Sequence, residues 1–134
     1  MLKKLPKNSI LQYQVIGPEN VALAMNAEDF AEVLGNLIDN ARKWAKSLVI
    51  ASVAINGSRA FVSVEDDGPG ISDDQQTRVL SRGVRLDEKV QGSGLGLSIV
   101  EAVLEDYGSK LDLGHAETGG LRAGFQVGVR KLIA

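Results

Sequence analysis

Hydrophobic residues recur along the chain with two different periods, and these periods predict the secondary structure. After Asn26, apolar residues recur at three- and four-residue spacing, which predicts a helix over residues 27–46 with Asn26 as its N-cap. The apolar positions of this helix are Phe30, Val33, Leu34, Leu37, Ile38, Ala41 and Ala45. A second apolar helical stretch covers residues 97–107, and Gly108 suits the C′ position at its end.

Shorter segments with apolar and β-branched side chains predict strands. We expect strands at residues 10–16, 21–25, 48–55, 59–65, 110–113 and 124–129. Asn56-Gly57 predicts a hairpin turn, because both residues tolerate positive φ, and residues 117–120 would connect the last two strands. Tight turns between consecutive strands favour antiparallel pairing, so the predicted class is α+β, with helices on one face of a mixed, mainly antiparallel sheet.

Two segments lack either period. Residues 1–8 are basic and read as a tail or a linker remnant, so the predicted domain comprises residues 9–134. Residues 72–91 are polar and carry Arg78, Arg82, Arg85 and Lys89. A stretch of about 20 residues of this kind inside a compact domain is usually a lid or a mobile loop.

Composition limits the classes of function. The chain of 134 residues suffices for one domain, and its net charge of −2 argues against a general nucleic-acid binder. The absence of cysteine excludes disulfides and thiolate metal sites, and a single histidine excludes a multi-histidine metal site. That residue, His115, has no Ser-His-Asp constellation around it, and we interpret it as a surface or structural side chain. No apolar run reaches the length that spans a bilayer, so we expect a soluble domain.

The first helix carries a polar stripe. Asn36, Asn40 and Lys43 occur at positions i, i+4 and i+7, so they form one narrow strip beside the apolar face. An amide oxygen is a reasonable Mg²⁺ ligand when nucleotide phosphates supply the charge, and Lys43 can donate to phosphate. Trp44 lies one step round from Asn40 and could cover an aromatic base. Each asparagine alone is better explained as a half-buried residue bonded to backbone, whereas the stripe with two glycine loops favours a nucleotide site.

A glycine-rich loop over residues 66–71 directly follows a predicted strand. The Asp66 carboxylate could accept a hydrogen bond from an exocyclic amine such as that of adenine, and the glycines would let the backbone approach a flat base closely. Taken alone, the segment is better explained as an ordinary turn, since Asp-Gly and Pro-Gly are both turn formers.

The run Gly92-Ser93-Gly94-Leu95-Gly96-Leu97 opens the second helical stretch. Bare backbone N–H groups at the positive end of a helix dipole can hold phosphate. The spacing is not that of a P-loop, and it fits a Rossmann site or a protein-kinase glycine loop badly. Arg82, Arg85 and Lys89 could reach the β- and γ-phosphates, although each alone is better explained as a solvated surface charge.

Taken together, these segments resemble the nucleotide-binding boxes of sensor histidine kinases. Residues 36–44 resemble the N box, Asp66-x-Gly68-x-Gly70-Ile71 the G1 box, and residues 92–97 the G2 box, in the family's order. The resemblance covers about residues 9–130, and its details are most similar to the PhoQ group. It implies the Bergerat, or GHKL, ATP-binding fold, a two-layer α/β sandwich with ATP between the helix layer and a lid.

The resemblance also implies roles at the phosphate end. Asn40 would ligate Mg²⁺ with Asn36 in support, Lys43 would contact phosphate, and Arg85 would meet the γ-phosphate from the lid. These four residues form the expected catalytic set. One departure is that Val79-Leu80 stands where the family usually has phenylalanines in the lid, which leaves lid closure and its trigger open.

At the base end, the resemblance implies that Asp66 binds the adenine amine and that Trp44 takes the place usually held by Tyr. The remaining expected cofactor-binding residues are Gly68, Gly70, Ile71, Arg82, Gly92, Ser93, Gly94, Leu95, Gly96 and Leu97. In the related gyrase and MutL ATPases a Glu activates water at the position of Asn36. Because Asn cannot be a general base, fast water attack is disfavoured, as a kinase requires.

The resemblance implies an enzyme: the catalytic domain of a sensor histidine kinase, which passes the γ-phosphoryl group of Mg-ATP to a histidine and then to a response regulator. Residues 1–8 contain no phosphoacceptor histidine, so the acceptor would lie on a separate dimerisation domain of a longer, homodimeric protein. We expect this domain in the cytoplasm and leave inner-membrane anchoring of the full-length protein open. The alternatives are a serine kinase of the anti-sigma-factor type, a non-catalytic module switched by ATP, and an α+β domain with fortuitous turns.

Overall fold

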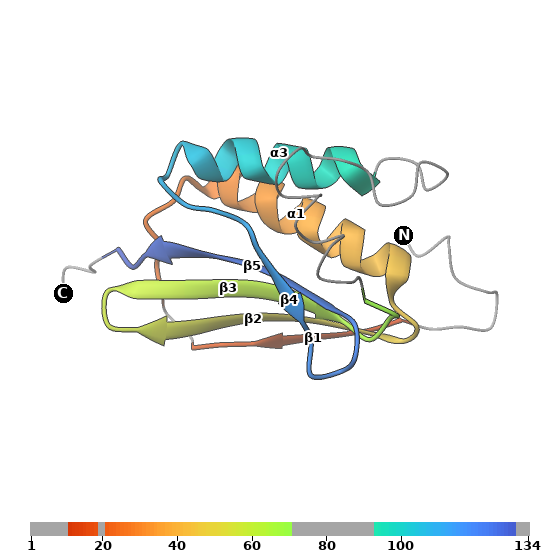
Figure 1. The fold of residues 1–134 in the computed structure, drawn as a ribbon. Helices are drawn as coiled ribbons and strands as arrows, with labels where there is room; N and C mark the ends of the chain where they lie inside the picture. The colour runs from red at the N-terminus through yellow and green to blue at the C-terminus, as the bar shows by residue number, and fades with distance from the viewer. Residues whose placement is uncertain (1–10, 19–20, 71–92, 131–134) are drawn as a thin grey trace.

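In the part of the chain that the computed structural model describes, helices α1 (Ala27–Trp44) and α3 (Ser93–Glu105) cover one face of a five-stranded sheet (Figure 1). The structure describes residues 11–18, 21–70 and 93–130. The elements are β1 (Gln12–Ile16), α1 (Ala27–Trp44), β2 (Leu48–Asn56), β3 (Arg59–Asp66), α3 (Ser93–Glu105), β4 (Asp112–His115) and β5 (Leu121–Gly128). This arrangement confirms the predicted α+β class with helices on one face. Among the described residues, no helix is both long and apolar enough to cross a membrane.

The sheet is mixed and mainly antiparallel, as predicted. Its strand order is β1-β2-β3-β5-β4, and only β1 and β2 pair in parallel. Strands joined by a tight turn pair antiparallel, whereas a parallel pair needs a crossover connection, which α1 supplies between β1 and β2. In the β2–β3 hairpin, Asn56 pairs with Arg59, so the loop is Gly57-Ser58, one residue later than predicted. Gly57 has the positive φ, +63°, that the turn requires.

Helix α1 begins where the sequence predicts. The side chain of Asn26 accepts hydrogen bonds from the N–H groups of Glu28 and Asp29, at 2.7 and 3.3 Å, which confirms the N-cap. The helix ends at Trp44, two residues before the predicted end. The reason is that the Asp67 carboxylate accepts the N–H group of Lys46, so the chain leaves the helix at this corner.

Helix α3 begins at Ser93, four residues before the predicted start, so Gly94 and Gly96 belong to its first turn rather than to a preceding loop. Glycine costs only about 1 kcal/mol in a helix, which packing against α1 can offset. The helix ends at Glu105 in place of the predicted residue 107. Gly108 confirms the predicted C′ position: its φ is +66°, and the next N–H group, that of Ser109, donates to the Leu104 carbonyl at 3.0 Å.

Three strand predictions need correction. Residues 21–25 form no strand, because this segment crosses the end of the sheet and makes one isolated bridge, between Leu23 and Val129. Strand β4 lies two residues later than predicted, and β5 begins three residues earlier. Gly114 and Gly124 interrupt the apolar alternation of β4 and β5, which explains why the pattern misplaced these strands. The connection 117–120 is confirmed as part of the turn, where the Ala116 N–H group donates to the Gly120 carbonyl at 2.9 Å.

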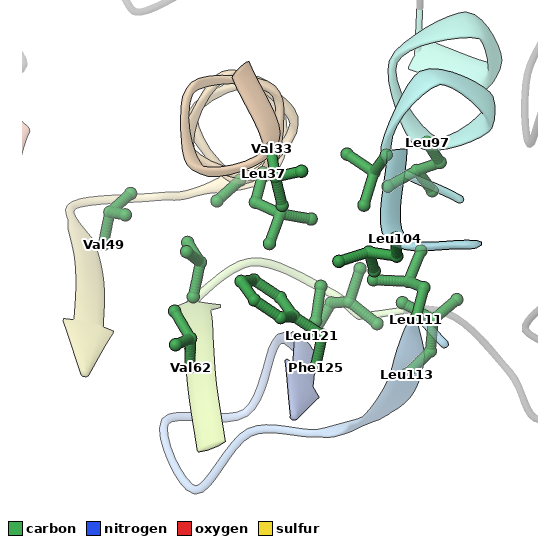
Figure 2. Close-up of a cluster of buried hydrophobic side chains, with 14 of the residues drawn as sticks. Val33, Leu37, Val49, Val62, Leu97, Leu104, Leu111, Leu113, Leu121 and Phe125 are labelled. Atoms are coloured by element: carbon green, nitrogen blue, oxygen red, sulfur yellow. The ribbon is translucent and has the colours of Figure 1, made fainter. Parts of the chain in front are cut away.

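The core lies between the helix layer and the inner face of the sheet (Figure 2). Figure 2 shows Val33 and Leu37 of α1 pointing toward Phe125 of β5, with Leu104 of α3 beside them. Phe125 is fully buried. Of the predicted apolar positions of α1, four are buried and three are partly buried against the same core: Val33, Leu37, Ala41 and Ala45, then Phe30, Leu34 and Ile38. The core therefore fixes α1 over the strand end that carries Asp66.

Candidate functional site

Asp66 is a buried carboxylate at the end of β3, with 1% of its surface exposed. Its Oδ1 accepts the Gly68 N–H group at 2.8 Å and has a longer contact, 3.5 Å, with the Leu121 N–H group. Its Oδ2 is buried and has no hydrogen-bond partner among the described residues. Burial raises the pKa of Asp66, the two N–H groups lower it, and the charges of Asp67 and Glu65 raise it further. A buried acceptor without a donor is costly unless a ligand supplies one.

Two glycines allow the chain to close around Asp66. A Cβ atom on Gly68 would lie 2.0 Å from the Trp44 carbonyl oxygen, and one on Gly120 would lie 2.1 Å from Asp66 Oδ1. The Thr118 hydroxyl donates to the Asp66 carbonyl at 2.6 Å. The loop after β3 therefore passes against the end of α1, and the β4–β5 connection contacts Asp66 directly. Gly68 therefore lies against the backbone of α1, and Gly70 has a φ of +74°. The expected approach of these glycines to a flat base stays a prediction.

The C-terminal half of α1 supplies two further polar atoms without partners. Asn40 is 4% exposed, and its Oδ1 is buried and unpaired among the described residues. The indole Nε1 of Trp44 is likewise buried without a partner there. Since the Trp44 carbonyl borders Gly68, these atoms belong to the same end of the domain as Asp66. Two buried acceptors and one buried donor are therefore available to a ligand with both donors and acceptors.

The other stripe residues have protein partners. The Asn36 side chain donates to the Glu32 carbonyl at 2.8 Å, so this residue is half-buried and bonded to backbone. Lys43 Nζ lies 3.9 Å from Asp39 Oδ2, and Asp39 also accepts from Arg42. Lys43 is mostly buried, with 14% of its side chain exposed. Roles for Asn36 and Lys43 toward metal and phosphate stay predictions.

The described part of the glycine run is the beginning of α3, and the N–H groups of its first turn have no acceptor within the helix. Gly94, Leu95 and Gly96 lie in this turn with Ser93. The Leu97 side chain is 1% exposed and packs in the core, so only its backbone is available to a phosphate. Four predicted site residues lie outside the described residues, as does Lys89: Ile71, Arg82, Arg85 and Gly92.

Asp67 was missed by the sequence reasoning. Its Oδ1 accepts the N–H groups of Lys46, Ser47 and Leu48 at 2.8, 3.0 and 3.1 Å, and its Oδ2 accepts the Ser47 hydroxyl at 2.7 Å. Burial raises the pKa of Asp67, but these hydrogen bonds outweigh it and hold the pKa at about 2. The only sequence signal was its place beside Asp66. Its partners lie 19 to 21 residues earlier in the chain, which no local pattern indicates.

The described residues contain no group of three or more His, Cys, Asp or Glu side chains that could hold a metal ion. The Asn40 amide oxygen, which has no partner among the described residues, is a suitable Mg²⁺ ligand, because Mg²⁺ prefers oxygen ligands and commonly combines few protein ligands with substrate phosphates.

Comparison with known proteins agrees with this arrangement. Residues 25–131 match the family described as histidine kinase-, DNA gyrase B-, and HSP90-like ATPase. The chain is 45% identical over 121 residues to the sensor protein kinase CarS of Pseudomonas aeruginosa, covering 90% of this chain and 27% of CarS. It is 36% identical over 107 residues to the sensor protein PhoQ of Escherichia coli, covering 80% of this chain and 22% of PhoQ. The chain thus spans about a quarter of the length of these relatives.

Solved structures show the same fold. The mycobacterial sensor histidine kinase MprB superposes with a TM-score of 0.76 at 25% identity, covering 91% of this chain and 84% of that one. Full-length ShkA, solved in complex with AMPPNP, superposes with a TM-score of 0.74 at 25% identity, covering 91% of this chain and 27% of that one. The resemblance to sensor kinases is confirmed, and the alternative classes are not favoured. The chain therefore belongs to the histidine kinase-, DNA gyrase B- and HSP90-like ATPase family, as an ATPase domain of the sensor histidine kinase type.

Proposed function

We propose that this domain binds Mg-ATP and donates the γ-phosphoryl group to a histidine on a separate dimerisation domain of a longer protein. The phosphoryl group would then pass to an aspartate of a response regulator. The full-length protein would be a homodimer with this domain in the cytoplasm. The sensor kinases CarS and PhoQ, of which the chain matches about a quarter, support this proposal.

The observation that carries the proposal is that the buried Oδ2 of Asp66 has no hydrogen-bond partner among residues 11–18, 21–70 and 93–130. An adenine amine would supply the donor that this buried carboxylate lacks, and a charge-assisted hydrogen bond of this kind contributes about 1.5–3 kcal/mol. The unpaired Nε1 of Trp44 offers a donor in return, and its ring offers a flat apolar surface to the base. The loop glycines would let the backbone approach the base closely beside Asp66.

At the phosphate end, Asn40 would hold Mg²⁺ through its unpaired Oδ1, with Asn36 in support, and the ion would neutralise phosphate charge. Lys43, and Arg85 from the lid, would donate to phosphate oxygens. Asn36 carries a neutral amide that cannot act as a general base, so attack of water on the γ-phosphate would be disfavoured. Catalysis would consist of positioning the γ-phosphoryl group for attack by the acceptor histidine and neutralising the phosphate charge.

Isothermal titration calorimetry with Mg-ATP tests the binding step. We expect Asp66→Asn to weaken binding about tenfold or more, because its amide N–H₂ group would face the adenine amine. Asn40→Ala should also weaken binding. The matched controls are Asp112→Asn on the exposed part of β4 and Asn56→Ala at the hairpin, and both should bind as wild type does. Equal affinity of wild type, Asp66→Asn and Asn40→Ala would show that the site assignment is wrong.

Phosphate transfer is tested by adding the histidine-bearing dimerisation domain of the full-length protein in trans with radiolabelled ATP. Acid-labile phosphate on that domain is the expected product. Acid-stable phosphate on a partner protein would support a serine kinase instead. Nucleotide binding without any transfer would support an ATP-switched interaction module.

A further inference from the structure

We propose that Asp67 is a positioning residue for the nucleotide base, which fixes the corner between α1 and β2 and so sets Trp44 opposite Asp66. The inference rests on the proposed function, because it concerns discrimination at the same nucleotide site. Asp67 would favour adenine over other bases indirectly, by holding Trp44 and Asp66 in place, and would not itself contact the nucleotide.

The first step is the number of hydrogen bonds that Asp67 accepts. Three consecutive backbone N–H groups, those of residues 46–48, converge on Oδ1 within 3.1 Å. The Ser47 hydroxyl occupies Oδ2 at 2.7 Å. Consecutive N–H groups that point to one place form an anion-binding concavity, and here a side chain of the protein fills it. The corner is therefore held by charge-assisted bonds from both of its sides.

The second step is the position of this corner relative to the site. Trp44 is the last residue of α1, only two residues before Lys46, and Asp66 directly precedes Asp67. The Asp67 bonds thus hold together two short segments, one that follows Trp44 and one that follows Asp66, and these two residues are the predicted base contacts. Gly68 brings the same two segments into close backbone contact, since a Cβ there would lie 2.0 Å from the Trp44 carbonyl oxygen. A shift of the corner would change the separation of Trp44 and Asp66 directly.

The third step is that strand β1 also holds the corner between α1 and β2. The Gln12 N–H group of β1 donates to the Ser47 carbonyl at 2.8 Å, which ties the same corner to the edge of the sheet. The low pKa of Asp67, about 2, keeps its carboxylate charged at any neutral pH. Asp67 is therefore suited to constant positioning and not to pH sensing.

Calorimetric titrations with Mg-ATP, Mg-ADP and Mg-GTP test the inference. We expect Asp67→Ala to weaken ATP and ADP binding by the same factor, about tenfold, because the base end is shared by both. GTP binding should change much less, so the ratio of ATP to GTP affinity should fall. Asp67→Asn should restore the ratio, because its amide oxygen can still accept the three N–H groups.

Tyr107→Phe is the control for a purely structural effect. The Tyr107 hydroxyl accepts the Asn26 N–H group at 3.1 Å and donates to Asp29, so this variant loses hydrogen bonds at the other end of α1. That end is about 27 Å away along the 18-residue helix. Tyr107→Phe should lower the melting temperature without changing the ATP to GTP ratio.

If Asp67→Ala does not fold, Ser47→Ala gives a milder test, since it removes only the hydroxyl bond and should lower the ratio less but in the same direction. An unchanged ratio in the folded variants, with normal binding by wild type, would overturn this inference alone. Wild type that binds no nucleotide would overturn the proposed function and this inference with it.

Discussion

The carboxyl groups of Asp66 and Asp67 belong to adjacent residues and have opposite hydrogen-bond environments. Both oxygens of Asp67 accept hydrogen bonds, whereas Oδ2 of Asp66 is buried without a partner among the described residues. Successive side chains at a strand end point in opposite directions, which separates the two groups. One carboxylate therefore completes the fold while the other stays available to a ligand.

Asp67 should make the stability of the domain acid-sensitive. Its folded-state pKa, about 2, lies below the ordinary value of 3.8, so its contribution is fully present above the ordinary value. That contribution should be lost as the pH falls from about 4 through 2. Melting temperatures of wild type and Asp67→Ala, followed by circular dichroism, should differ at pH 6 and converge near pH 2. A difference that stays constant over this range would contradict the assignment.

Asp66 should give a pH dependence of the opposite sign. Its pKa is raised by burial, so the folded state holds a proton that the unfolded chain has already released. Stability should therefore fall as the pH rises from about 3.8 through the raised pKa. In Asp66→Asn this decrease should be absent, which a urea denaturation series across that pH range would measure. The variant Asp112→Asn, on the exposed part of β4, serves as the control.

Trp44 provides an internal optical signal, because it is the only tryptophan of the chain. Its Nε1 is buried and has no hydrogen-bond partner in the described part of the chain, so a nucleotide that contacts the indole should change its hydrogen bonding and the polarity around it. We expect the emission to change with Mg-ATP at the same dissociation constant that calorimetry gives. Constant emission during calorimetrically observed binding would place the base elsewhere. Inorganic phosphate with Mg²⁺ is the control ligand.

Gly68 should not tolerate a side chain. A Cβ atom would lie 2.0 Å from the Trp44 carbonyl oxygen, which is backbone and cannot move aside cheaply. Gly68→Ala should therefore destabilise the domain by about 3 kcal/mol, as overpacking does, and weaken nucleotide binding. Gly35→Ala is the matched control, because nothing lies within 4 Å of a Cβ there. That helical, exposed position should instead gain about 0.5–1 kcal/mol in urea denaturation.

Phe125 should dominate the stability of the core. It is fully buried where both helices meet the sheet (Figure 2), and Phe125→Ala should cost about 3–5 kcal/mol. Ile99→Ala, at a position that is 40% exposed, should cost much less. Equal losses in equilibrium unfolding by urea would contradict the position of the core described above.

Local signals explain which parts of the fold could be predicted from sequence. The Asn26 cap, the Gly57 turn and the Gly108 helix end each depend on a few neighbouring residues, and all three are present. The segment 21–25 has a strand-like composition, but within the described residues it pairs with the sheet only through the isolated Leu23–Val129 bridge. Its place in the tertiary structure, which no local pattern shows, therefore prevents a strand. The limits of β4 could not be predicted because Gly114 lies within the strand and adds nothing to the apolar alternation.

The residues of the candidate site likewise fall into those that a local motif identifies and those that only the tertiary structure reveals. Asn40, Trp44 and Asp66 could be named because each belongs to a motif. Each has a buried polar atom for which the described part of the structure supplies no partner. Asp67, Thr118 and Gly120 could not be found, because their partners are distant in the chain. Asn36 and Lys43 carry no such unpaired atom among the described residues, so motif membership alone supports their roles.

The polar atoms of Asn40, Trp44 and Asp66 that lack partners within the described ranges also affect how long the domain survives in a cell. A ligand that satisfies them binds the folded chain and not the unfolded one, so it adds to stability by mass action. At a concentration one hundred times its dissociation constant, this gain is about 2.7 kcal/mol. Degradation by cellular proteases, which attack transiently opened chains, would then slow when ATP is abundant and quicken when it is scarce.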